Sequence, residues 1–146
     1  MVEKYRGGEV PSARPTTLDA AIPGVLERYR TAMEANLLHE GVAAAYELVM
    51  AANAFVQETA PWKLAKDPER ATELDAALAS MVRVLAVAAV LFSPFMPART
   101  ADLWGRLGSG HATLPPLVEV AELSVAGWRV AAGEVLFPRA DLPAKV

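Results

Sequence analysis

Trp62 is the residue with the clearest capacity for chemistry, because it stands between a proline and two lysines. Pro61 has no amide hydrogen and cannot lie inside a helix, so a helix that precedes it should end or kink near Ala60. Trp62 would then lie at a corner, where an indole beside Lys63 and Lys66 can stack on an unpaired base. A second interpretation fits the same residues: the indole plugs the junction between two helices.

The rest of the sequence shows no catalytic constellation. It has no glycine-rich nucleotide-binding loop and no Ser/His/Asp or Cys/His arrangement. The two histidines, His39 and His111, lack the spacing of metal ligands. Acidic pairs such as Glu34 with Glu40 are typical of a solvated helix face. We therefore predict a chain that carries out no reaction and holds no metal.

Composition and charge narrow the classes of function further. A chain of 146 residues, 53% of them hydrophobic, is long and apolar enough for one folded domain. It contains no cysteine, which excludes a disulfide scaffold and is typical of the cytoplasm. The net charge is −3, so any RNA contact must be local and cannot rest mainly on phosphates. The apolar run 84–92 is too short to span a bilayer, and the N-terminus has no signal-peptide core.

Hydrophobic periodicity predicts a helical bundle. A helix end and a connector over residues 1–15 come first. The main helices are expected from about Pro23 to a turn at 36–39, from Glu40 to Ala60, from Glu69 to Phe92, and from Pro97 to Gly108. The third is apolar on nearly every side from Val84 onward, which is typical of the centre of a bundle. Trp104 falls on the inward side of the fourth and is expected in the core.

The second helix has one apolar stripe that contains a polar residue. The stripe consists of Val42, Tyr46, Val49, Asn53 and Val56. A half-buried asparagine must satisfy its amide, so we expect Asn53 to hold the Pro61–Trp62 corner rather than to touch a ligand. In the third helix the expected buried stripe consists of Leu74, Leu78, Met81 or Val82, Leu85, Ala89 and Phe92.

The sequence loses its helical period after Gly110. These observations divide the chain into a connector (1–15), a bundle (16–110) and an irregular C-terminal segment (111–146). In the last part, 117–123 reads as a short strand or a poor helix, and 128–130 and 135–137 as brief extended pieces. Such a segment needs a surface to fold against, either the bundle or a domain that is absent from this chain.

Four phrases of the sequence occur together, and in this order, in one protein family. They are Tyr5-Arg6-Gly7-Gly8-Glu9-Val10-Pro11, the run from Ala52 to Lys66, Ser93-Pro94-Phe95-Met96-Pro97 with Ala101-Asp102-Leu103-Trp104 and Leu107-Gly108, and Leu136-Phe137-Pro138-Arg139. The family is the anticodon-binding helical domain of methionyl-tRNA synthetases, which this chain resembles over nearly its whole length. The run from Ala52 to Lys66 is the most specific of the four.

The resemblance implies an all-α antiparallel bundle of the class I synthetase type and recognition of the CAU anticodon of methionine tRNA. In the family, the tryptophan of the Pro-Trp corner stacks on an anticodon base, and that position is Trp62 here. Asn53, Pro61 and Lys63 would support the corner. Because unpaired loops expose the faces of their bases, this role agrees with the stacking interpretation, which we favour over the plug.

The resemblance also implies what lies outside this chain. The family's first bundle helix carries an asparagine and an arginine that read the edge of the first anticodon base, and we expect it upstream of Met1. The family's catalytic domain, with HIGH-like and KMSKS-like motifs, ATP with Mg and a zinc-bearing insertion, is absent as well. We therefore expect a fragment with no cofactor of its own, whose partners are methionine tRNA and the missing catalytic domain, and neither DNA nor a membrane.

Two alternatives remain open from the sequence. The chain could be a stand-alone helical interaction module that binds a protein and no tRNA, which its acidic charge favours. It could also be the corresponding domain of a synthetase for cysteine, leucine or valine, although those lack the Pro-Trp corner.

Overall fold

The computed structural model describes residues 1–138, and the regular elements in this range are helices. The main ones are α2 (Ile22–Glu34), α3 (Leu38–Thr59), α5 (Ala71–Phe92) and α6 (Pro97–Leu107). Short helices join them: α1 (Val2–Arg6), α4 (Pro61–Leu64), and the 3₁₀ turns η1 (Asp19–Ala21), η2 (Pro68–Arg70) and η3 (Leu117–Glu122). The predicted all-α bundle is confirmed.

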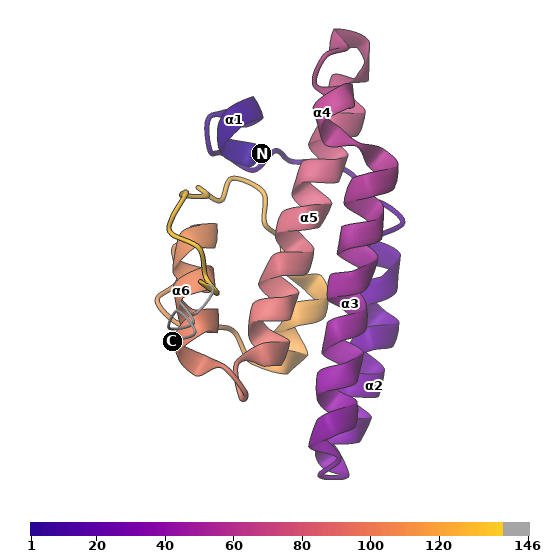
Figure 1. Ribbon diagram of the computed structural model, residues 1–146, viewed down its shortest axis with the longest axis vertical. Coiled ribbons are helices and arrows are strands. Elements are labelled where there is room, and N and C mark those ends of the chain that lie inside the picture. The colour runs from indigo at the N-terminus through magenta and orange to yellow at the C-terminus, as the bar shows by residue number, and fades with distance from the viewer. Residues whose placement is uncertain (139–146) are drawn as a thin grey trace, which may run out of the picture.

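The helices lie along the long axis of the molecule (Figure 1). α2 and α3 form a hairpin on one side, α5 packs on α3, and α6 packs on the other side of α5. The α2–α3 turn lies at one end of the long axis, and α4 lies at the other end, where α3 passes into α5. α3 has 22 residues and, at about 1.5 Å of rise per residue, spans about 33 Å between these two ends.

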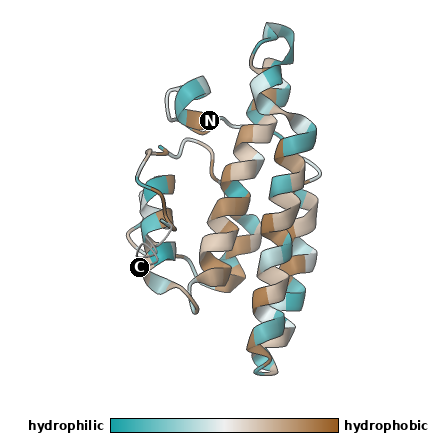
Figure 2. Ribbon diagram, in the orientation of Figure 1, coloured by the Kyte–Doolittle hydropathy of each residue, from teal (hydrophilic) through white to brown (hydrophobic). Residues whose placement is uncertain are grey.

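α5 is the central helix of the core. Leu78, Ala86, Val87 and Leu91 have no exposed surface, and hydrophobic residues cover much of the helix (Figure 2). The span Pro68–Phe92 is long and apolar enough to cross a membrane by length and composition, although the run 84–92 alone is too short. In the bundle, 78% of its apolar window is buried, which is the environment predicted for a central helix.

The buried stripe of α3 differs from the predicted one. Tyr46 is 56% exposed, and the buried residues are Gly41, Ala44, Ala45 and Leu48. Small residues face α2 because the two helices approach closely: a Cβ on Gly41 would lie 2.8 Å from Met33 Sδ. Sequence periodicity could not select this stripe, since α3 has apolar residues on most of its sides.

One further core prediction is wrong for a related reason. Leu85 is 44% exposed, because it lies on the side of α5 that lines an open hollow. Apolar character alone did not indicate which side of each helix a neighbour covers.

The N-terminal connector and the C-terminal segment pair with one another. Glu9 forms an isolated antiparallel bridge with Arg129, and Val10 N–H donates to Trp128 O at 2.9 Å. Trp128 also meets Trp104 edge to face, with ring centroids 5.3 Å apart. Trp104 is 3% exposed, so its predicted place in the core is confirmed.

The other predicted extended pieces take different forms. Residues 117–122 form the 3₁₀ turn η3, which answers the strand-or-helix alternative in favour of a poor helix. Residues 135–137 form no strand, and 136–137 lie in a bend. Arg139, the last residue of the fourth family phrase, lies outside the described residues.

A buried polar cluster ties η1 to α5. The Asp19 carboxylate accepts hydrogen bonds from Thr16 N–H at 2.6 Å, from the Ser80 hydroxyl and from the Arg83 guanidinium. Arg83 also donates to Leu123 O, just after η3, at 3.3 Å. The cluster therefore holds three distant segments of the chain together.

Candidate nucleic-acid interface

A sharp corner separates α3 from α4, and a single residue makes it. α3 ends at Thr59 and α4 begins at Pro61, which is well placed at the first position of a helix. Ala60, between them, has left-handed backbone angles, φ 44° and ψ 65°. Its N–H donates to Val56 O at 3.0 Å, and its carbonyl accepts from Lys63 N–H at 2.7 Å. Ala60 thus caps both helices, and the predicted break near this residue is where the chain turns.

Trp62 projects from this corner. Its side chain is 40% exposed, whereas Trp104 is 3% and Trp128 is 9% exposed. Its neighbours Pro61 and Leu64 are fully buried and seat α4 on α5. Of the two interpretations of Trp62, a fully closed plug does not describe this arrangement, because the residue is 40% exposed.

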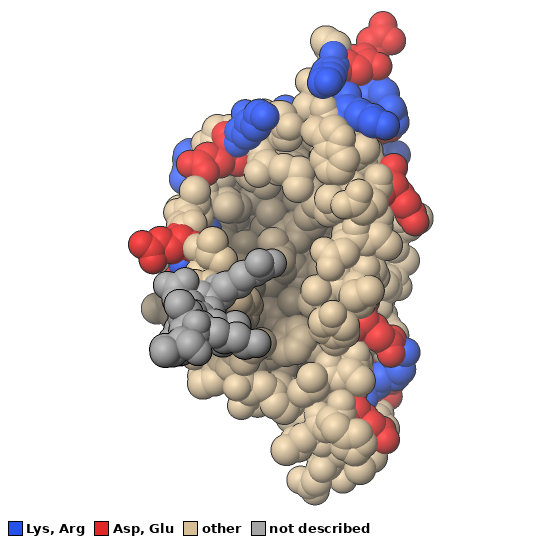
Figure 3. Space-filling model, in the orientation of Figure 1, with Lys and Arg blue, Asp and Glu red and all other residues tan. Residues whose placement is uncertain are grey.

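The charge at this end of the molecule is mixed, and two of its cations are free. Lys63 and Lys66 are exposed, and neither forms an ion pair with any of residues 1–138. Arg70, further along, pairs with Glu73 at 2.5 Å. Figure 3 shows Lys and Arg side chains gathered at the end of the molecule that α4 occupies, with carboxylates beyond them.

Asn53 does not have the predicted role. It is exposed rather than half-buried, and the hydrogen bonds that shape the corner within residues 1–138 come from the backbone and from Thr59, whose hydroxyl donates to Phe55 O. The physical reason is the helical phase: Asn53 is five residues after Leu48, about 140° around α3 from the buried stripe. Asn53 lies instead on the rim of the hollow beside Leu85.

This hollow has a volume of about 390 Å³ and a mostly apolar lining. Figure 3 shows it as a concave surface with neither basic nor acidic side chains on its floor. Its walls come from α1, α3, α5, the end of α6 and the segment 130–132. They are formed by Met1, Val2, Glu3, Ala52, Asn53, Val56, Leu78, Met81, Val82, Leu85, Leu107, Val130, Ala131 and Ala132.

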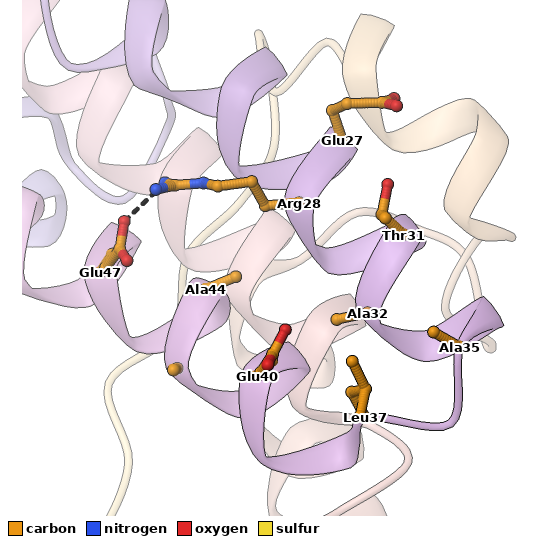
Figure 4. A pocket seen from close by; sticks show the side chains of 10 residues that line it. Glu27, Arg28, Thr31, Ala32, Ala35, Leu37, Glu40, Ala44 and Glu47 are labelled. Atoms are coloured by element: carbon orange, nitrogen blue, oxygen red, sulfur yellow. Dashed lines mark ion pairs between the residues drawn. The ribbon is translucent and has the colours of Figure 1, made fainter.

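A second depression lies at the opposite end, between α2 and α3, and it is acidic (Figure 4). Its volume is about 430 Å³. Glu47 pairs with Arg28 at 2.5 Å across it, while Glu27 and Glu40 line it as well. Glu27 also pairs with Arg30, so among residues 1–138 Glu40 is left without an arginine partner here and the arginines are neutralised. The end with Trp62 is therefore the more favourable one for RNA.

Comparisons with known proteins show which family the chain resembles. A family model described as the anticodon binding domain of methionyl tRNA ligase matches residues 6–141. The chain belongs to this family. The match includes the whole described bundle and the corner with Trp62.

Individual relatives are similar to the chain over its full length. A methionine–tRNA ligase of Lactiplantibacillus plantarum is 31% identical over 100% of this chain and 23% of its own length. One of Streptomyces coelicolor is 33% identical over 97% of this chain and 29% of its own. The apo methionyl-tRNA synthetase of Mycobacterium tuberculosis shares the fold with a TM-score of 0.87 at 24% identity, over 98% of this chain and 30% of that one. The chain thus spans about a quarter of the length of the relatives it matches.

The residue that sequence reasoning missed at this site is Ala60. Its left-handed conformation determines where Trp62 points, yet alanine is not a residue type that predicts positive φ. The sequence did contain one signal for it: the helical pattern continues to Thr59 and a proline follows at 61, so a single residue must make the turn.

Proposed function

We propose that this chain binds the CAU anticodon loop of methionine tRNA, as the anticodon-binding part of a methionine–tRNA ligase. The observation that carries the proposal is the exposed indole of Trp62 on a rigid corner. Anticodon bases are unpaired and present their faces, so an exposed aromatic ring is the matching surface. The proposal is also supported by membership of the anticodon-binding family.

The remaining parts of the proposal concern the whole protein. A catalytic domain outside this chain would activate methionine with ATP and Mg and transfer it to tRNA. This chain would supply the anticodon contact, and we predict that the protein is cytoplasmic. Base-edge reading would need groups outside this chain, because stacking is tolerant of sequence.

The expected affinity follows from stacking and two cations. One stacked base contributes about 1–3 kcal/mol, so Trp62→Ala should weaken binding by about 5-fold to 150-fold. If Lys63 and Lys66 each neutralise one phosphate of a single-stranded loop, log K should fall with log salt at a slope of about −1.4. A steep slope would indicate a phosphate-dominated contact elsewhere.

The test is a fluorescence titration of the chain with a hairpin that carries a CAU loop, a scrambled loop, or no loop. We expect the CAU hairpin to bind, the fully paired duplex to bind far more weakly, and Trp62→Ala to lose most of the affinity. Tyr46→Ala is the matched control, because it removes another exposed ring from α3 at a distance from the corner. Because base-edge reading needs groups outside this chain, the scrambled loop should bind about as tightly as the CAU loop. Binding of the fully paired duplex as tight as that of the CAU hairpin, or full affinity in Trp62→Ala, would contradict the proposal.

A further inference from the structure

We propose that Ala60 is a positioning residue, whose left-handed conformation fixes the direction of Trp62 for stacking. The inference rests on the proposed function, since it concerns how the same platform is presented. Ala60 and Asn36 are the non-glycine residues with positive φ among 1–138. Asparagine tolerates this region well, whereas alanine adopts it against a steric cost from its Cβ.

The setting of Ala60 explains why such a conformation persists. Around Asn36, residues 35–37 connect two helices. At Ala60 the linker is one residue, so one pair of backbone angles sets the course of α4 relative to α3. The residue is 7% exposed and is hydrogen-bonded through both its N–H and its carbonyl. Strain held in place by its surroundings in this way is typical of functional sites.

The proline that follows adds a second restriction. Pro61 disfavours helical angles at the residue before it, so Ala60 cannot simply continue α3. Because Pro61 and Leu64 are buried against α5, α4 is anchored below while Trp62 points outward. The indole is thereby held before any ligand arrives, which lowers the entropy lost on stacking.

Ala60→Gly tests the inference because it permits the same angles without the Cβ and also permits others. We expect the variant to keep its fold and thermal midpoint, because the steric cost is removed. Affinity for the CAU hairpin should fall by about twofold to tenfold, the range for ordering one side chain on binding. Asn36→Gly is the matched control, since it makes the same change at the other left-handed position, at the opposite end of α3.

A readout independent of RNA separates this inference from the proposed function. In the full chain labelled with 5-fluorotryptophan, the ¹⁹F signal of Trp62 is identified by its loss in Trp62→Phe. In Ala60→Gly we expect that signal to narrow and shift toward the solvent-exposed value, with the signals of the two buried tryptophans unchanged. An unchanged Trp62 signal would overturn the inference. If the wild type binds no hairpin, the proposed function fails, and the ¹⁹F comparison still decides whether Ala60 positions the ring.

Discussion

The replacement Asp19→Asn should destabilise the fold strongly at neutral pH and weakly in acid. One carboxylate oxygen of Asp19 accepts from the Arg83 guanidinium, and the other accepts from Thr16 N–H and the Ser80 hydroxyl. The Arg83 guanidinium on one side and Thr16 N–H on the other can only donate. An asparagine must place its NH₂ group on one of the two sides, where it faces donors whichever way the amide is turned.

The magnitude follows from two losses. The side chains of Asp19 and Arg83 are 10% and 18% exposed, so solvent replaces little of what is lost. A hydrogen bond to a charged group contributes about 1.5–3 kcal/mol, and an unpaired buried donor costs about 1–3 kcal/mol. The sum agrees with the cost of about 3–5 kcal/mol for breaking a buried ion pair by removing one partner. For a domain of this size that corresponds to a fall in Tm of about 6–20 °C.

The pH dependence follows from the pKa of Asp19. Burial alone would raise this pKa, but the hydrogen bonds, the first from Ser80, and the charge of Arg83 together lower it below the usual value. A lowered pKa in the folded state means that the stabilisation is fully present above the unfolded pKa of about 3.9 and is lost as pH falls through the folded value. The difference between wild type and Asp19→Asn should therefore be constant above about pH 5 and shrink below pH 4.

Urea unfolding followed by circular dichroism, from pH 7 down to pH 2.5, measures this difference directly. Taking the difference cancels the titration of all other carboxylates. Glu27→Gln is the control: its ion pair with Arg30 is largely exposed, and its loss should leave the free energy of unfolding close to that of the wild type at any pH. A gap between wild type and Asp19→Asn that stays the same from pH 7 to pH 2.5 would refute the reasoning, as would a gap below 0.5 kcal/mol at pH 7.

Two further predictions concern the space around Gly108 and the buried hydrogen bond of Tyr29. Gly108→Ala should destabilise the fold by more than Gly110→Ala. Both glycines have positive φ, which costs about 1–2 kcal/mol for a residue with a side chain. A Cβ on Gly108 would in addition lie 1.9 Å from Arg129 O, whereas a Cβ on Gly110 would meet no atom within 4 Å. Thermal unfolding measures the pair, and equal losses would contradict this packing. Tyr29→Phe should lower the free energy of unfolding in urea by about 1–3 kcal/mol. The Tyr29 hydroxyl donates at 2.7 Å to Leu91 O in the last turn of α5, where carbonyls lack a helical partner. No loss of stability would mean that another donor takes the place of the hydroxyl.

Much of the fold could be predicted from the sequence because proline and glycine residues mark where its helices begin and end. Prolines at 23, 61, 68 and 97 stand near the starts of helical elements, and Gly108 follows the end of α6 with φ 69°. These residues restrict the backbone locally, so their effect does not depend on tertiary contacts. Helix existence and the corner before Trp62 could therefore be located from residues alone.

The faces of the helices could not be predicted in the same way. Tyr46, Leu85 and Asn53 were assigned to buried stripes, and all three are exposed. In α3 and α5 apolar residues occur on several sides, so the periodicity does not select one. Which side is buried depends on small residues such as Gly41 that admit a neighbour closely, and on where the rest of the chain leaves a hollow.

The proposals assign stability and recognition to separate residues of this bundle, and that separation makes them testable. Asp19 stabilises the fold through η1 and α5, far from the corner, so a folded Asp19→Asn protein at pH 7 should bind a CAU hairpin as the wild type does. Ala60→Gly should do the opposite, with stability kept and affinity reduced. If both substitutions lowered affinity in proportion to stability, the corner would be only as rigid as the global fold, and Trp62 would need no positioning residue.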